Sequence, residues 1–431
     1  MRDLLLTAII LGCLPVCLFN PQFAILSYVW VGLMNPHRLV YRLSHFPVAL
    51  TFALATVAGM IIRQRFGRFP VRGETLLILV LFCYTTVTTI MALGPEAWGQ
   101  WDKFGKILLM SIVAAMLLQT RKRLNHFVLV VTGSIAFFGL KGGVFSILTR
   151  GNYTVWGPTE TFISDNNDLA LAELMVLPLI LYFVRQEKGW RNLALKAAFA
   201  LVVISILFSY SRGALVAFGG LTVIMAWRSR YRVRALASAV IIASLLVAFA
   251  PPAWMGRMHT IETYKEDPSA LGRLNAWGFA WNLALSRPIG GGFKAFTPEL
   301  FLRYAPDPHN YHDAHSIYFQ ILGEQGFLGL AIFLALMATS LLRLQRLRKQ
   351  TKGEPEWKWV RDLAEMLQCS IVAYAMAGTF LGLAYFDLYY YIVIAGVLLD
   401  VVYTGEKRAL ATAALPEPAP AWPVVPAPRP A

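Results

Sequence analysis

Charged residues are scarce in this 431-residue sequence: only 15% of the residues are Asp, Glu, Lys or Arg, whereas 57% are hydrophobic. A soluble protein would carry about 25% charged and about 45–50% apolar residues. This shortage of charge excludes an ordinary soluble globular fold. Long, nearly uncharged runs recur from one end of the sequence to the other, and a helix of about 20 apolar residues can cross a bilayer. The composition therefore predicts an all-α polytopic membrane protein.

Cysteine is also scarce, and common metal-binding motifs are missing. The four cysteines all fall within apolar runs, where Cys is typical of packing, and their spacing offers neither a disulfide framework nor a metal site. The sequence contains no HExxH, CxxC or DxD motif. It also shows no internal repeat, which leaves an inverted-repeat transporter without support.

Thirteen apolar segments are separated by loops, and the basic residues cluster in alternate loops. The segments lie near residues 3–19, 22–34, 47–62, 74–93, 103–119, 126–148, 168–184, 192–209, 212–227, 235–251, 316–342, 362–380 and 384–403. Several Lys or Arg residues occur in the loops 63–72, 121–123, 185–191, 228–234 and 343–361. By the positive-inside rule these loops face the cytoplasm. This topology accounts for most of the net charge of +15, and a nucleic-acid surface is a poor explanation because the charge is divided among short loops.

The same alternation places four stretches on the outer side, namely 94–102, 149–167, 210–213 and 252–315. The C-terminus then lies inside. The first two apolar segments are short and interrupted by Asn20-Pro21. If they form one crossing, the chain has about 12 transmembrane helices with both ends inside. If each crosses, the N-terminus is outside; the sequence favours the first count.

The chain is thus expected to form one membrane domain, residues 1–414, followed by a tail. The N-terminus looks like a signal peptide but lacks a small-residue cleavage site, so we expect a retained helix. The tail, residues 415–431, is rich in Pro and Ala and is expected to be disordered in the cytoplasm. The long outer loop 252–315 carries six basic and six acidic residues, and an amphipathic helix within it should stop before Pro288.

Three arginines on the outer side are candidates for binding an anion. Arg212 follows a turn between two spans, and Gly213 would let a large group approach the backbone. Arg273 and Arg287 are fourteen residues apart, nearly four helical turns, so they can share one face. Guanidinium groups bind phosphate oxygens in a bidentate manner. The alternatives are an interfacial, snorkelling Arg212 and solvated surface roles for the other two.

Three of the seven histidines, His309, His312 and His315, lie just before the apolar run that begins at residue 316. One alternative is a structural role. Another is a metal site completed by Asp307 or Asp313, which would need three or four converging ligands. The third is a general base, because a neutral imidazole can accept a proton from a hydroxyl. The sequence favours His315 as the base, since it stands where the loop enters the membrane.

Lys141 and Tyr318 complete the candidate residues. Lys141 lies in the outer half of the sixth segment, where an intramembrane charge suggests an anionic partner, unless the side chain snorkels outward. Tyr318 follows His315 by three residues. Cations that hold an anionic lipid head group, next to a base for a hydroxyl, suggest group transfer from a lipid phosphate.

At these residues the chain resembles the O-antigen ligase and polymerase superfamily. The matching elements are SRGA at 211–214, GRLNAW…RPIGGGF at 272–293 and HSIYFQILGEQGFLGL at 315–330. MNPHR at 34–38 and YTVWGPTETFISDNNDLAL at 153–171 look like the exosortase-associated O-glycosylation ligase branch. The resemblance covers most of the chain except the tail.

The resemblance implies a glycosyltransferase of the GT-C type in a Gram-negative inner membrane, with a periplasmic site and with neither metal nor cofactor. It implies that Arg212, Arg273 and His315 are catalytic, and that a glycan passes en bloc from undecaprenyl pyrophosphate to an acceptor hydroxyl with inversion. Our own reading adds Arg287, Lys141, Tyr318 and His312 as substrate-binding residues.

The leading acceptor is the lipid A–core oligosaccharide, in lipopolysaccharide biosynthesis. The alternatives with the same donor are an O-antigen polymerase and a protein O-oligosaccharyltransferase. A lipid-glycan transporter is a remote alternative, because the candidate residues stay on one side of the membrane.

Overall fold

The computed structural model consists of helices and connecting loops, and it describes residues 2–40, 46–228 and 268–413, with residues 43, 232, 233, 237 and 255 as isolated positions. No strand occurs among these residues. The helices are α1 (Arg2–Phe19), α2 (Pro21–Met34), α3 (Val48–Ile62), α4 (Gly73–Ile90), α5 (Ala97–Leu117), α6 (Arg121–Leu148), α7 (Asn166–Gln186), α8 (Gly189–Leu207), α9 (Arg212–Arg228), α12 (Pro268–Ser286), α13 (Pro298–Tyr304), α14 (Ile317–Gln350), α15 (Lys358–Ala377) and α16 (Asp387–Ala413), with 3₁₀ turns η1 (Pro36–Leu39) and η2 (Pro355–Trp357).

The helices follow the apolar segments expected from the sequence. Every expected segment within the described residues coincides with a helix, and the largest differences are extensions of α5, α14 and α16 beyond the apolar run. The expected segment 235–251 and the tail 415–431 lie outside the described residues. In the long loop the structure confirms a helix, α12, which ends at Ser286 just before the Arg287-Pro288 pair. Leu274, Trp281 and Leu285 on its other face are at least half exposed, so α12 is apolar on both faces and is not the amphipathic helix that was expected.

Six described helices are long and apolar enough to cross a membrane: α4, α6, α7, α8, α14 and α16. Helices α1, α2 and α3 are apolar but shorter. The chain is therefore a multi-pass membrane protein, and 12 crossings stay a prediction. Leu54 of α3 and Leu148 of α6 are 62% and 77% exposed, which suits a surface that faces lipid instead of water.

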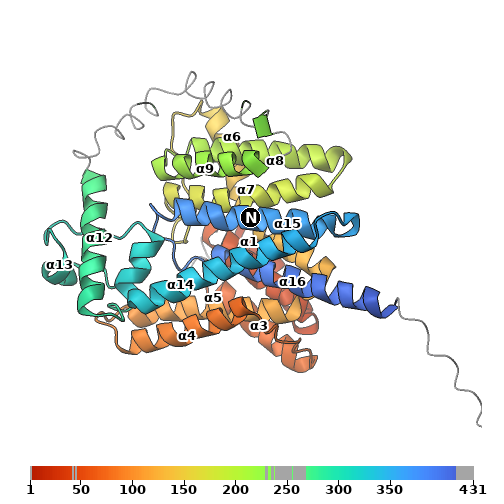
Figure 1. Cartoon of the computed structure of the whole chain (residues 1–431), viewed down its shortest axis with the longest axis horizontal. Helices are drawn as coiled ribbons and strands as arrows, with labels where there is room; N and C mark the ends of the chain where they lie inside the picture. Colours follow the sequence, from red (N-terminus) through yellow and green to blue (C-terminus); the bar gives the residue numbers. More distant parts are fainter. Residues whose placement is uncertain are drawn as a thin grey trace, which may run out of the picture.

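The basic loops come together at one end of the bundle, which we call the basic end. The guanidinium of Arg121 lies 4.4 Å from the ring centroid of Trp359, and Arg185 pairs with Glu365 at 3.3 Å. These contacts join the loops before α6, after α7 and before α15. Figure 1 shows α12 crossing the opposite end of the bundle, which we call the α12 end. This one-sided distribution agrees with the alternation of charge along the sequence.

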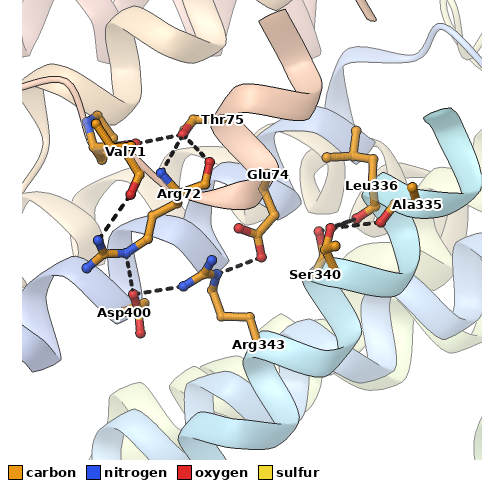
Figure 2. Close-up of polar contacts among 11 residues, drawn as sticks. Val71, Arg72, Glu74, Thr75, Ala335, Leu336, Ser340, Arg343 and Asp400 are labelled. Carbon is orange, nitrogen blue, oxygen red and sulfur yellow. Dashed lines mark hydrogen bonds and ion pairs between the residues drawn. The ribbon is translucent and has the colours of Figure 1, made fainter. Parts of the chain in front are cut away.

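An ion-pair network joins α4, α14 and α16 at the basic end (Figure 2). Arg343 donates from Nε to Glu74 Oε1 at 2.6 Å and from Nη1 to Asp400 Oδ2 at 2.9 Å. Arg72 Nε donates to the same Asp400 oxygen at 2.6 Å. Glu74 is only 1% exposed, so its carboxylate depends on the charge of Arg343.

Replacing Arg343 by Met should destabilise the folded protein by about 2–4 kcal/mol, because it leaves Glu74 buried without its cation. Because Arg72 still pairs with Asp400 in this variant, the loss of stability should be smaller than if both carboxylates were left without a cation. Thermal unfolding of the purified protein in detergent measures the change. The matched control is Arg346→Met, an exposed position on the same helix, for which a change within about 0.5 kcal/mol is expected. Equal midpoints for the two variants would contradict the prediction.

Helices α12 and α13 form a small apolar cap at the α12 end. One face of α12 buries Ala276, Phe279, Ala280 and Leu283, a spacing that forms one stripe along a helix. Phe279 stacks on Phe301 of α13 with ring centroids 4.3 Å apart. This cluster is separate from the main core, so the cap can hold residues of α12 above the ends of the spans.

Helix α14 is broken at Gly326, about two and a half turns after its start at Ile317. Gly326 has φ 67° and ψ −169°, a conformation that is essentially restricted to glycine. The next residue, Phe327, donates its backbone N–H to the carbonyl of Pro288 at 3.1 Å. The segment before the break therefore has its own direction, set by the loop that follows α12.

A glycine-rich strap, residues 288–292, satisfies the backbone groups that the break leaves open. Gly291 N–H donates to Gly323 O at 2.9 Å, and Gly292 N–H donates to Glu324 O at 2.8 Å. A helix end buried without such partners would be costly. The RPIGGGF and GEQG sequences therefore form a structural unit that fixes the α12 end.

Candidate active site

His315 lies directly before α14 at the α12 end, and its side chain is exposed. Its φ of 41° lies in the left-handed region, which is uncommon for a residue other than glycine and needs support from the surroundings. Ile317 N–H donates to Gly378 O at 2.8 Å. Gly382 of the same α15–α16 loop packs against the His315 backbone. The loop 378–386 therefore holds the histidine in place.

Helix α12 clamps the loop that leads to this histidine. Asn275 Nδ2 donates to the carbonyls of Asp307 and Asn310, both at 2.8 Å, and Asn275 Oδ1 accepts from Asp307 N–H at 2.8 Å. Trp277 Nε1 donates to Ala314 O at 2.8 Å, directly before the left-handed residue. The loop and α12 thus move as one body.

Arg273 lies on the same part of α12, two residues before Asn275, and is half-buried. Its neighbour Gly272 has a specific packing role. A Cβ there would lie 2.6 Å from Nδ1 of His312, so only glycine lets this imidazole pack on the helix. His312 Nδ1 is buried, and no hydrogen-bond partner for it occurs among the described residues. The His312 imidazole therefore lies against α12 at the residue next to Arg273.

The charged groups around His315 come from several elements. The imidazole is partly accessible to solvent. Its partial burial has the largest effect on the pKa of His315 and lowers that pKa. The charge of Arg273 lowers this pKa further, Asp313 and Asp165 raise it, and His312 lowers it. The net direction is downward, so the imidazole is neutral at neutral pH and can accept a proton. His312 lies three residues before His315 in the clamped loop, and Arg273 lies on the helix that clamps this loop.

Arg212 begins α9 at a tight turn at the same end. Tyr210, with φ 60°, is held by a 2.8 Å hydrogen bond from its hydroxyl to Gly151 O. Ser211 Oγ accepts from Ala214 N–H at 3.2 Å and caps the helix. A helix N-terminus carries a partial positive charge and exposed N–H groups, and Arg212 adds a full charge.

The loop 378–386 connects this turn with the histidine. Gly213 packs against Phe380, whose Cβ would lie 3.2 Å from a side chain at the glycine. The same loop contacts His315 through Gly382. The start of α9 and the start of α14 therefore flank one loop, which places Arg212 and His315 at one site.

Two residues at the start of α7 belong to this site and were not expected from the sequence. Asn166 Nδ2 donates to Ser209 O at 2.6 Å, in the turn before α9. Asp165 caps α7 by accepting from Asn167 N–H at 2.8 Å. The SDNND sequence is a typical helix N-cap, so the cap was predictable. Its position near His315 follows only from the packing of α7.

Arg287 does not join this site. Its Nη2 donates to Met91 O at 2.8 Å, and its Nε donates to Gly290 O at 3.2 Å. Fourteen residues of helix place it about 21 Å from Arg273. In the structure Arg287 binds backbone carbonyls that tie the end of α12 to α4, and a substrate-binding role for it stays a prediction.

Lys141 and Tyr318 have local contacts of their own. Lys141 is exposed on α6, with its ammonium 5.7 Å from the ring centroid of Phe137. The Tyr318 hydroxyl donates to Ala375 O at 2.9 Å and ties α14 to α15. A substrate-binding role for either residue stays a prediction.

A metal site at the three histidines was one alternative from the sequence. In the described part of the chain, no three His, Cys, Asp or Glu side chains converge as metal ligands. The backbone N–H of His309 donates to Asp307 Oδ1 at 3.1 Å, which places both residues in a turn of the clamped loop.

The convergent residues define a chemistry. We call the set Arg212, Arg273, His312, His315 and Asp165 the α12-end site. It combines a neutral, accessible base with two guanidinium groups and a helix N-terminus. Such an arrangement can hold an anionic leaving group and remove a proton from a hydroxyl.

Two family models match the chain. Residues 197–334 match the O-antigen ligase family, and residues 1–188 match a family of unknown function. No curated protein matches the chain. The first match contains Arg212, Arg273 and His315, and it supports the O-antigen ligase superfamily for this part of the chain. Asp165 lies in the second.

Proposed function

We propose that the protein transfers a glycan en bloc from undecaprenyl pyrophosphate to a hydroxyl of the lipid A–core oligosaccharide, as an O-antigen ligase. The observation that carries this proposal is the convergence of Arg212, Arg273 and His315 at one end of the bundle, inside the O-antigen ligase match. A role in glycan transfer agrees with that match. The α12 end lies opposite the basic loops, so the positive-inside rule makes it periplasmic in a Gram-negative inner membrane.

The chemistry uses the side chains of the site alone. Arg212, at the N-terminus of α9, and Arg273 bind the pyrophosphate of the donor, where negative charge develops as the bond to the sugar breaks. His315 accepts the proton of the acceptor hydroxyl, and the hydroxyl oxygen attacks the anomeric carbon from the face opposite the pyrophosphate. The new glycosidic bond forms with inversion, undecaprenyl pyrophosphate leaves, and the imidazolium returns its proton to solvent. The proposal includes a GT-C type architecture with about 12 crossings.

A reconstituted transfer assay tests this function. Purified protein receives undecaprenyl-pyrophosphate glycan and lipid A–core in the presence of EDTA, alongside His315→Ala. Product from the wild-type protein and none from the variant would support a metal-independent ligase centred on His315. If the undecaprenyl-pyrophosphate glycan stayed intact with every hydroxyl acceptor tested, the result would contradict the proposal.

A second candidate function is protein O-glycosylation with the same donor. Burial raises the pKa of Tyr311, which lies beside the site, and the carboxylates of Asp313, Glu96 and Glu299 raise it further. These acids make the potential near this hydroxyl more negative, which would suit an uncharged serine or threonine acceptor better than a phosphorylated one. Adding a Ser/Thr peptide as a competing acceptor in the same assay distinguishes the two acceptors.

A further inference from the structure

A groove at the basic end lies between the C-terminal end of α14, with the turn after it, and the start of α15. These two helices pack side by side (Figure 1). The groove has a volume of about 470 Å³, and all but one of its lining side chains are cationic. The lining residues are Gln345, Arg348, Lys349, Lys352 and Arg361. Such a concentration of one sign of charge makes the groove electropositive.

Arg348 is held in this groove by uncharged partners. Its Nη1 donates to Gln368 Oε1 at 2.9 Å and to Gln345 Oε1 at 3.1 Å. The same Gln368 oxygen accepts from Nη1 of Arg228, at the end of α9, at 3.5 Å. Within the described part of the chain, one carboxylate lies within 4.0 Å of these two guanidinium groups, that of Glu365, at 4.0 Å from Arg348 Nη2. The two arginines therefore share a neutral amide and keep an excess of positive charge.

The other cations of the groove add to this excess. Arg361 Nη1 donates to Thr351 O at 3.1 Å, at the C-terminus of α14. In the described structure no carboxylate lies within 4.0 Å of Arg361, Lys349 or Lys352. Arg343, at the same end of the bundle, has two carboxylates within 2.9 Å. The dipole of α14 offsets only about half a unit of charge, so most of the positive charge in the groove is not neutralised.

The position of the groove along α14 favours a lipid over a soluble anion. The apolar run of this helix ends at Leu342, which is 67% exposed. At 1.5 Å per residue, Gln345 and Arg348 lie about 5–9 Å beyond this end, where the head groups of a bilayer lie. Lys349 follows Leu342 by seven residues and lies on the same face of the helix. An exposed leucine next to the cations offers a contact for an acyl chain.

We propose that this groove binds the phosphate of an anionic phospholipid in the leaflet at the basic end, which the positive-inside rule makes cytoplasmic. Arg348 and Arg361 supply fixed guanidinium groups, which donate to phosphate oxygens in a bidentate manner, and Lys349 and Lys352 add point charges. Basic pockets between membrane helices are suited to such head groups. The groove lies at the opposite end of the bundle from the α12-end site, so this inference does not depend on the proposed transfer reaction.

Titration of phosphatidylglycerol into the full-length protein in a neutral detergent, followed by native mass spectrometry, measures the apparent Kd. Lys349→Gln/Lys352→Gln removes two exposed cations of the groove and no ion pair, so the fold should be kept. Each lost cation weakens binding to an anionic lipid about 5-fold, so this double variant should bind about 25-fold more weakly than the wild-type protein. Phosphatidylcholine, which has no net charge, should bind much more weakly than phosphatidylglycerol.

Lys122→Gln/Arg346→Gln is the matched control, because both positions are exposed at the basic end and neither lines the groove. Its Kd should stay within about 2-fold of the wild-type value, since solvent and salt screen charges outside the groove. Equal weakening in the two double variants, or equal affinity of the wild-type protein for the two lipids, would overturn the proposal. Displacement of the bound lipid by an excess of inorganic phosphate would show that the groove takes a soluble anion, and it would overturn the proposal as well.

Discussion

Arg273→Ala should lower kcat/KM for glycan transfer by about 100-fold or more. Arg273 follows Gly272, which packs against His312, and its charge lowers the pKa of His315, so we expect it to bind the pyrophosphate next to the base. Its removal leaves the developing charge of the leaving group without a fixed cation. The protein should still insert and purify, because Asn275 and Trp277 keep the histidine loop clamped to α12. Initial rates with undecaprenyl-pyrophosphate glycan measure the loss.

Arg287→Ala is the matched control for this result. The sequence makes both arginines candidates for binding an anion, whereas in the structure Arg287 donates to the carbonyls of Met91 and Gly290. The Arg287 variant should therefore have a lower thermal midpoint and a nearly unchanged rate per folded molecule. Equal rate losses in the two variants would show that the sequence interpretation was right and that the structural assignment of Arg287 was not.

His315→Ala should reduce kcat by about 100-fold to 10,000-fold, because the acceptor hydroxyl loses its base. In the wild-type protein, crowding and Arg273 lower the pKa of His315 below its ordinary value near 6.5. A base with a lowered pKa loses its proton at lower pH, so the midpoint of the acidic limb of kcat/KM should lie below pH ~6.5. In His315→Ala this acidic limb should be absent. The pH–rate profiles of the two proteins test both statements.

Tyr318→Phe provides the control for disturbance of α14. It removes a hydroxyl that donates to Ala375 O three residues after the histidine, and it leaves the imidazole in place. It should retain the acidic limb of the wild-type profile. Near wild-type turnover in His315→Ala would exclude this histidine as the base and direct attention to the carboxylates of the site.

The helices and the candidate residues inside the O-antigen ligase match were predictable because apolar runs and short motifs are local features of the sequence. Each apolar run within the described residues became a helix, since a segment in lipid must satisfy its own backbone hydrogen bonds. The helix in the long loop ended before Pro288, where the ring prevents continuation. Arg212 and His315 stood out because charges at the outer ends of apolar runs are rare, and Arg273 stood out because it lies in the GRLNAW motif.

Other features were decided by contacts between distant segments. The role of Arg287 depends on the end of α4, and the glycine run of the strap depends on the break at Gly326. Asp165 was recognisable as a helix cap, but its place near His315 depends on how α7 packs beside the turn before α9.

The sequence by itself determined that the chain is a helical membrane protein, where its described helices lie, and which motifs carry its candidate chemistry. Only the tertiary structure decided which of those residues share a site. The physical reason is that lipid is as apolar as the interior of the bundle, so hydropathy marks each helix without specifying its neighbours. Neighbours are chosen by shape and by polar contacts such as the clamp of Asn275 and the bond from Asn166 to Ser209, and these join residues far apart in the chain.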